Sequence, residues 1–186
     1  MPTPSIGHLV PFCKFAEKLV DRDERLCVTI LIIRPPPPWG STLDAFIERI
    51  SSAPEGNRIR YIILAQIELP SLEELAKSIE NYISLLIASY RPIVKDAIIS
   101  NKAWPATDSN PKIVGLVIDM FCTSMIDVAN ELDIPPYLFF TSGAAFLGFL
   151  FYLSVWHDQF GREFNRSDPV TSKVLPTFAF VKEGYD

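Results

Sequence analysis

The sequence predicts an α/β protein with a doubly wound parallel sheet, which carries helices on both faces. Short apolar runs rich in Val and Ile alternate along the chain with longer segments of helical periodicity. Such continuous runs are typical of strands buried on both faces, and strands that alternate with helices form right-handed crossovers in a parallel sheet. The series begins with a helix, however, so we expect a first strand that is truncated to residues 1–4.

The opening segment predicts a helix, a strand and a stiff loop. Apolar residues recur at helical spacing from Leu9 to Val20, with charged residues between them, which indicates an amphipathic helix. Residues 26–34, LCVTILIIR, form an almost continuous β-branched run and predict a strand. The next residues, PPPPWG, cannot lie in a helix or a central strand. We favour a loop at the strand end over a polyproline ligand for another domain.

The middle of the chain continues the alternation. Residues 41–52 predict a short helix that is capped by the Ser or Thr at its start, and residues 59–65 predict a strand. Residues 68–100 form a long helical stretch with a Ser-x-x-Glu capping box at 71–74. We expect Pro92 to bend or divide this helix.

The last part of the chain predicts two more strand and helix pairs. Residues 111–121 predict a strand, residues 122–133 a helix, residues 136–142 a short strand and residues 143–160 a helix. Residues 137–156 carry no charge and are about long enough to cross a bilayer. A Thr-Ser-Gly interruption early in this stretch leaves too short an apolar run after it, so we expect no membrane span.

Composition and charge exclude several classes of protein. The chain has 186 residues, of which 48% are hydrophobic, and this is enough for a packed core. The net charge of -5 gives no electrostatic reason to bind nucleic acid, which requires a basic face. Cys13, Cys27 and Cys122 are odd in number and far apart, so we expect buried thiols rather than disulfides or a metal site. We also expect a cytoplasmic protein, because no secretory signal opens the chain.

A histidine and an aspartate are the candidate catalytic pair. In a doubly wound sheet of order 3-2-1-4-5, ligands bind outside the carboxyl ends of the strands, where strands 1 and 4 meet. The loop after strand 1 carries His8, and strand 4 ends at Asp119, so we expect these side chains to face each other. A neutral imidazole can accept the proton of a hydroxyl. A carboxylate on its other nitrogen fixes the tautomer and stabilises the imidazolium.

The positions of His8 and Asp119 in the sequence are also consistent with roles other than catalysis. A histidine at a helix start is usually a surface or capping residue, and an aspartate after a strand usually caps the next helix. The fingerprints of other chemistries are missing from the sequence: it has no Gly-x-Gly-x-x-Gly, no phosphate-binding loop with lysine and no Gly-x-Ser-x-Gly. Dinucleotide binding, nucleoside triphosphate binding and serine hydrolysis therefore have no support.

Two stretches of the sequence resemble a known family. MPTPSIGHLVPFCKFAEKLVDRD, at residues 1–23, is similar to the opening of plant family 1 UDP-sugar glycosyltransferases. VIDMFCTSMIDVANELDIPPYLFFTSGA, at residues 117–144, is similar to their fourth strand, helix and fifth strand. The likeness extends to about His157 and resembles most the enzymes that glucosylate flavonoids, anthocyanidins and other small phenols.

The resemblance implies a fold, a reaction and roles for particular residues. Such proteins have two Rossmann-like domains in the GT-B arrangement, and residues 1–186 would be an incomplete N-terminal domain for the acceptor. His8 would be the general base, Asp119 its orienting partner, and Thr141 a contact to the donor. The acceptor would lie against His8 and a set of apolar residues, namely Trp39, Met120, Phe121, Phe146 and Phe149. Glucose or another hexose would pass from a UDP-sugar co-substrate to a phenolic hydroxyl with inversion, without a cofactor.

Departures from the family pattern limit what we expect of this chain alone. Ser5 stands where glycine is usual, which reduces the left-handed freedom of the turn. Residues 1–4 are too few for a full first strand, and no UDP-binding signature box or C-terminal domain is found before Asp186. We therefore expect a fragment with little activity of its own. The alternative is a non-catalytic module, derived from such an enzyme, that binds a small molecule or a partner.

Overall fold

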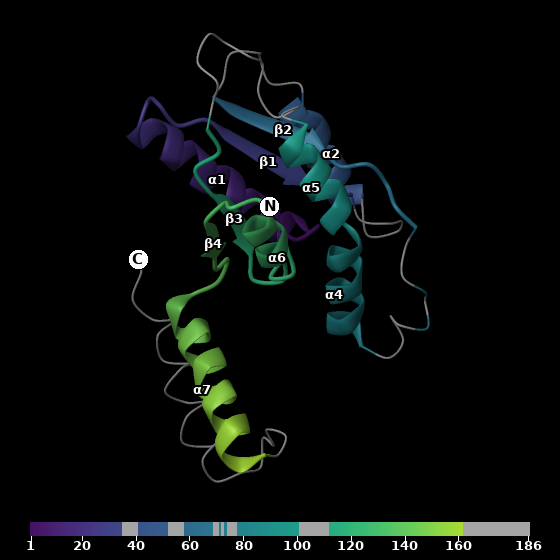
Figure 1. Ribbon diagram of the computed structural model, residues 1–186, viewed down its shortest axis with the longest axis vertical. Coiled ribbons are helices and arrows are strands. Elements are labelled where there is room, and N and C mark those ends of the chain that lie inside the picture. The colour runs from purple at the N-terminus through teal and green to yellow at the C-terminus, as the bar shows by residue number, and fades with distance from the viewer. Residues whose placement is uncertain are drawn as a thin grey trace. The chain divides into compact units, whose positions relative to one another are not determined.

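The computed structural model describes most of the chain and separates it into two units, residues Met1–Phe139 and Phe140–Asp186. The described residues are 1–34, 41–51, 58–68, 71, 73, 78–100 and 112–161. They form an α/β fold with parallel strand pairs (Figure 1). The fold class predicted from the alternation of apolar runs and helical segments is therefore confirmed.

Helices and strands alternate through the described part of the first unit. In chain order its elements are α1 (Ile6–Arg22), β1 (Val28–Ile32), α2 (Ser41–Ser51), β2 (Ile59–Ile63), α4 (Ile79–Ser89), α5 (Arg91–Ile99), β3 (Leu116–Asp119), α6 (Met125–Glu131) and β4 (Pro136–Phe139). Each strand is shorter than the apolar run that predicts it. The proline-rich loop predicted at residues 35–40 lies outside the described residues.

The described strands form two parallel pairs. β1 pairs with β2, with Val28 opposite Ile59, and β3 pairs with β4, with Leu116 opposite Pro136 (Figure 1). In the predicted order 3-2-1-4-5 these pairs are strands 2 and 3 and strands 4 and 5. Both predicted neighbour relations are therefore confirmed.

The segment before α1 lies along β3. The nitrogen of Met1 donates to the carbonyl oxygen of Val117. The backbone N–H of Asp119 in turn donates to the carbonyl oxygen of Met1 at 3.1 Å. These bonds place the chain just before α1 beside the strand that ends at Asp119, which is where the predicted order puts strand 1.

The strand β1 separates two hydrophobic clusters of the first unit. Ile30 and Ile32 pack in a cluster with residues of α1 and α2, whereas Leu31 and the following Ile33 pack in a cluster with residues of α4 and α5. Successive side chains of a strand point to opposite faces of the sheet. Helices therefore cover both faces of β1, as its continuous apolar run predicts.

Pro92 divides the long helical stretch, as predicted. α4 ends at Ser89, and Pro92 lies in the first turn of α5, where its missing N–H removes no helical hydrogen bond. The capping box predicted at 71–74 falls partly outside the described residues. The cap that the structure describes is Ser78, whose side chain accepts from the N–H of Asn81 at 3.2 Å.

Two single residues differ from expectation. Ser5 precedes α1 with φ -148° and ψ 148°, which is extended backbone that any residue adopts, so the turn makes no use of the left-handed freedom of glycine. The expectation that all three thiols are buried is wrong. Cys13 and Cys122 are buried, but Cys27 is exposed because it lies in the turn before β1 and not in the strand itself.

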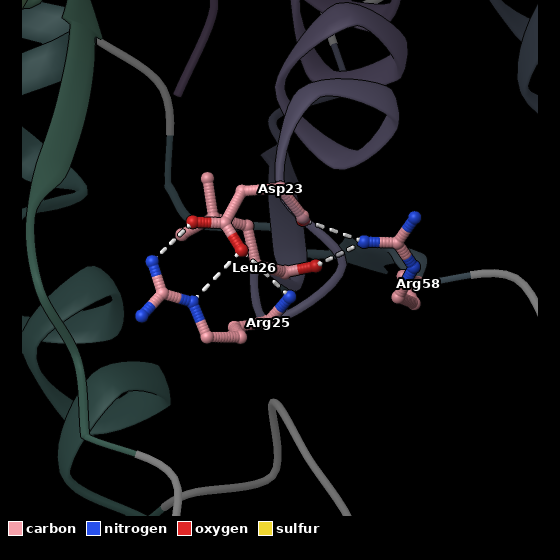
Figure 2. Close-up of polar contacts among 4 residues, drawn as sticks. All are labelled: Asp23, Arg25, Leu26 and Arg58. Carbon is pink, nitrogen blue, oxygen red and sulfur yellow. Dashed lines mark hydrogen bonds and ion pairs between the residues drawn. The ribbon is translucent and has the colours of Figure 1, made fainter.

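Arg58, just before β2, binds the turn between α1 and β1 (Figure 2). One guanidinium nitrogen of Arg58 donates to the carbonyl oxygens of Asp23 at 2.8 Å and Leu26 at 3.2 Å. The Asp23 carboxylate accepts from Arg25, and this hydrogen bond lowers the pKa of Asp23 to about 2. The polar turn is therefore held from the neighbouring strand as well as from within.

The described part of the second unit contains α7 (Ala144–Phe160), the helix predicted at residues 143–160. Gly161 caps the end of this helix, and its φ of 58° is the left-handed conformation that favours glycine after a helix. The N–H of Gly161 donates to the carbonyl oxygen of His157 at 2.8 Å. Among the described helices, α7 included, none is both long and apolar enough to cross a membrane.

Candidate active site

His8 and Asp119 are far apart in the sequence but in direct contact in the fold. His8 lies in the first turn of α1, and Asp119 is the last residue of β3. The Nδ1 atom of His8 is 2.5 Å from the Oδ2 atom of Asp119. The contact predicted from topology is therefore present, at the carboxyl end of a parallel strand.

The Asp119 carboxylate is completely buried and is held by hydrogen bonds to both of its oxygens. Oδ2 accepts from the backbone N–H of Thr3 at 3.0 Å as well as from His8, and Oδ1 accepts from the backbone N–H of Met120 at 2.7 Å. Burial of a carboxylate is unfavourable unless such donors compensate it. The donors also fix the plane of the carboxylate.

The contact with Asp119 selects one tautomer of His8. A neutral imidazole has one N–H and one unprotonated nitrogen. Because Nδ1 faces a carboxylate oxygen, the proton belongs on Nδ1, and Nε2 is the nitrogen that can accept a proton. The His8 side chain retains 22% of its exposure, so part of it faces solvent. The pair can therefore act as an oriented general base.

Met120 and Phe121 follow Asp119 and lie beside the same pair. The Phe121 ring meets the His8 ring edge to face, with centroids 5.6 Å apart and planes at 62°. Phe121 is 38% exposed, and Met120 is half-buried. The structure thus brings together four of the residues named from the sequence, and their roles toward a ligand stay predictions.

The remaining predicted site residues lie elsewhere in the chain. Thr141 and Phe146 belong to the second unit, where Thr141 is half-buried and Phe146 is 43% exposed in the first turn of α7. The Phe146 ring centroid lies 6.1 Å from that of Phe140 and 6.4 Å from that of Phe149. Trp39 lies outside the described residues.

Thr3 and Cys122 are neighbours of the pair that sequence reasoning missed. Both are buried, and the Oγ1 atom of Thr3 is 3.7 Å from the Sγ atom of Cys122. Burial raises the pKa of the Cys122 thiol to about 11. The available signal was the sequence Pro-Thr-Pro, in which Thr3 alone has a backbone N–H to donate. Within the part of the chain that is described, no group of three or more His, Cys, Asp or Glu could hold a metal ion.

Comparison with known proteins gives relatives of one kind. No protein-family model matches the chain. UDP-glycosyltransferase 71D2 of Arabidopsis thaliana is 35% identical over 201 residues, which cover 100% of this chain and 41% of that protein. UDP-glucose flavonoid 3-O-glucosyltransferase 6 of Fragaria ananassa is 36% identical over 200 residues, which cover 99% of this chain and 40% of that protein.

A solved structure of the same kind of protein is also similar to this chain. UGT71G1 of Medicago truncatula, complexed with UDP-glucose, matches with a TM-score of 0.67 and 36% identity, covering 90% of this chain and 33% of that chain. The chain spans about two fifths of the length of the curated relatives that it matches. Over that span the chain is similar to plant UDP-dependent glycosyltransferases in both sequence and fold.

Proposed function

We propose that this chain is the acceptor-binding, N-terminal part of a UDP-glycosyltransferase. The enzyme would transfer glucose or another hexose from a UDP-sugar to a hydroxyl of a flavonoid, anthocyanidin or other small phenol. The contact between His8 and Asp119 carries the proposal, because it supplies an oriented base where α/β sheets bind ligands. The Fragaria ananassa relative is named for flavonoid glucosylation, and the Medicago truncatula structure contains UDP-glucose, which supports the two substrate classes.

In the proposed reaction, His8 removes the acceptor's hydroxyl proton through Nε2. The acceptor oxygen attacks the anomeric carbon of the sugar from the face opposite UDP. The new C–O bond forms as the bond to the diphosphate oxygen breaks, UDP leaves with the electron pair, and the anomeric configuration inverts. Asp119 keeps the Nδ1 proton in place and stabilises the imidazolium that forms.

The neighbours of His8 suit a flat phenolic acceptor. The partly exposed Phe121 ring meets the His8 ring edge to face, so an aromatic acceptor can pack against apolar surface beside the base. We propose Met120 and Phe121 as acceptor contacts from this geometry. The acceptor role of Phe146 and the donor role of Thr141 are proposed from the family resemblance alone.

We also propose that the chain has little activity alone and that the protein acts in the cytoplasm. The chain spans about two fifths of its relatives, and in the family that it resembles the UDP-sugar is held mainly by the C-terminal domain. The described cysteines are free thiols, which fits a reducing compartment. Imaging of a fluorescent fusion would test the location.

Complementation with a donor-binding domain tests the proposed function. The chain would be combined with the C-terminal domain of the Medicago truncatula relative, given UDP-glucose and a panel of phenols, and assayed for glucosides by mass spectrometry. We expect transfer that His8→Ala abolishes and that His157→Ala, a change of the other histidine in the chain, leaves intact. Transfer that persists in His8→Ala contradicts the base role, and phenol binding without transfer favours a non-catalytic binding module.

A further inference from the structure

We propose that Thr3 is a positioning residue that sets the geometry of both His8 and Asp119. Thr3 is polar but only 5% exposed, and it lies between Pro2 and Pro4 in the segment that runs along β3. Its importance for sugar transfer rests on the function proposed above. Its effect on the His8 ring is a property of the fold and can be measured without any turnover.

The backbone N–H of Thr3 orients the carboxylate. Proline has no backbone N–H, so Thr3 provides the single amide donor of the Pro2-Thr3-Pro4 segment. That donor lies 3.0 Å from the Oδ2 atom of Asp119, the same oxygen that His8 contacts. Two donors therefore converge on one oxygen, and the position of this oxygen decides where the His8 ring settles.

The carbonyl oxygen of Thr3 links it to the backbone of His8. It accepts from the N–H of Ser5 at 2.7 Å, which closes a three-residue turn around Pro4. The carbonyl oxygen of Ser5 then accepts from the N–H of His8 at 3.1 Å. Two successive backbone hydrogen bonds thus connect Thr3 to the first turn of α1, so Thr3 holds both members of the pair.

The hydroxyl of Thr3 anchors it on the other side. It lies 3.7 Å from the Sγ atom of Cys122, and the N–H of Cys122 donates to the carbonyl oxygen of Asp119 at 2.8 Å. A residue before proline also avoids the helical region and stays extended. Thr3 is therefore fixed by its amide, its carbonyl and its hydroxyl, and it can act as a rigid reference for the pair.

An ester at position 3 tests the proposal by removing one N–H and little else. A synthetic peptide of residues 1–12, with an ester in place of the Pro2–Thr3 amide and with 15N in the His8 ring, can be ligated at the natural Cys13 to residues 13–186. The 15N spectrum of His8 reports which ring nitrogen carries the proton. We expect Nδ1–H to dominate in the all-amide chain, and a severalfold larger Nε2–H fraction in the ester chain.

A matched ester at Gly7 is the control. Gly7 lies in the first turn of α1, where a helix offers no acceptor for the N–H, so this ester is expected to retain the tautomer of the all-amide chain. The proposal would be overturned if the chain with the ester at position 3 folds and its His8 spectrum equals that of the all-amide chain. Far-UV circular dichroism would establish that each ligated chain is folded.

A second measurement needs no altered backbone and decides the question if the ester chain does not fold. Scalar coupling across a hydrogen bond, between the Thr3 15N and the Asp119 carboxylate 13C, is expected in the all-amide chain. Failure to detect it, while coupling across the bond from Asp119 N–H to Met1 C=O is visible, would refute the positioning role. Neither readout involves sugar transfer, so this proposal and the transferase proposal can fail separately.

Discussion

The Asp119 side chain accepts hydrogen bonds on both sides of its carboxylate. His8 and Thr3 face one oxygen, and the backbone N–H of Met120 faces the other. An ionised carboxylate consists of acceptors alone, whereas a carboxamide has an acceptor at one side and a donor at the other. The two acceptor oxygens of Asp119 therefore match the donors on both sides of its side chain, and this match does not depend on any part in catalysis.

Asp119→Asn is expected to lower the free energy of unfolding by about 1–3 kcal/mol, because the new NH2 group must face a buried donor. Urea denaturation of the purified chain measures the change. Asp127→Asn is the matched control: the Asp127 side chain is 60% exposed and pairs with Arg91, and such surface pairs contribute about 0–1 kcal/mol. Equal stability of the Asp119→Asn chain and the native chain would contradict the hydrogen bonding described for Asp119.

At the scale of the elements, the Arg58 contacts join α1, β1 and β2. Arg58→Met keeps the apolar stem of the side chain but removes the donors to the carbonyl oxygens of Asp23 and Leu26 (Figure 2). We expect a loss of about 1–3 kcal/mol in unfolding free energy, because these carbonyls lose a charged donor. Hydrogen exchange should also become faster in the turn between α1 and β1.

Arg25→Met is the control for Arg58, since both guanidinium groups contact Asp23. Arg25 is 85% exposed, so its ion pair is screened by water and its loss is expected to change stability little. The pKa of Asp23, lowered to about 2 by Arg25, should rise toward its ordinary value in the Arg25→Met chain. If the two substitutions destabilise the chain equally, the bonds of Arg58 to the turn carbonyls have no special role.

The elements that the sequence predicts correctly have strong local signals. β1 is a continuous β-branched run that is buried on both faces, and Pro92 ends one helix and begins the next because it lacks an N–H. Burial of single side chains was harder to predict. Cys27 looks like part of an apolar strand in the sequence, but pairing with β2 begins only at Val28.

The candidate site was predictable only where topology decides it. The carboxyl ends of parallel strands share one edge of a sheet. This arrangement brings Asp119, the last residue of β3, to His8, which follows the segment that lies along β3. Thr3 was missed because it acts through a backbone N–H, which every residue except proline has. Which acceptor this N–H binds depends on where residues 1–3 lie along β3, and the types of these residues do not determine that position.

At the scale of the first unit, burial of a thiol and of a phenolic hydroxyl is expected to make the fold less stable at alkaline pH. Burial raises the pKa of Cys122 from 9.0 to about 11 and that of Tyr61 from 10.0 to about 12. The unfolded chain therefore loses these protons at a lower pH than the folded chain does. Their contribution to stability is complete below about pH 9, and it declines as the pH rises through 11 and 12.

Urea denaturation at a series of pH values between 7 and 11 tests this expectation. The free energy of unfolding should fall above about pH 9, and Cys122→Ala should reduce the fall between pH 9 and pH 11 by about 2 kcal/mol. The pH dependence is informative even though the Ala substitution also removes packing, because lost packing lowers stability equally at every pH. Cys27→Ala, which removes an exposed thiol, is the matched control. Parallel curves for the native and Cys122→Ala chains would show that the thiol ionises as readily in the folded state as in the unfolded state, and hence that water reaches the turn between β3 and α6 that supports Thr3 and Asp119.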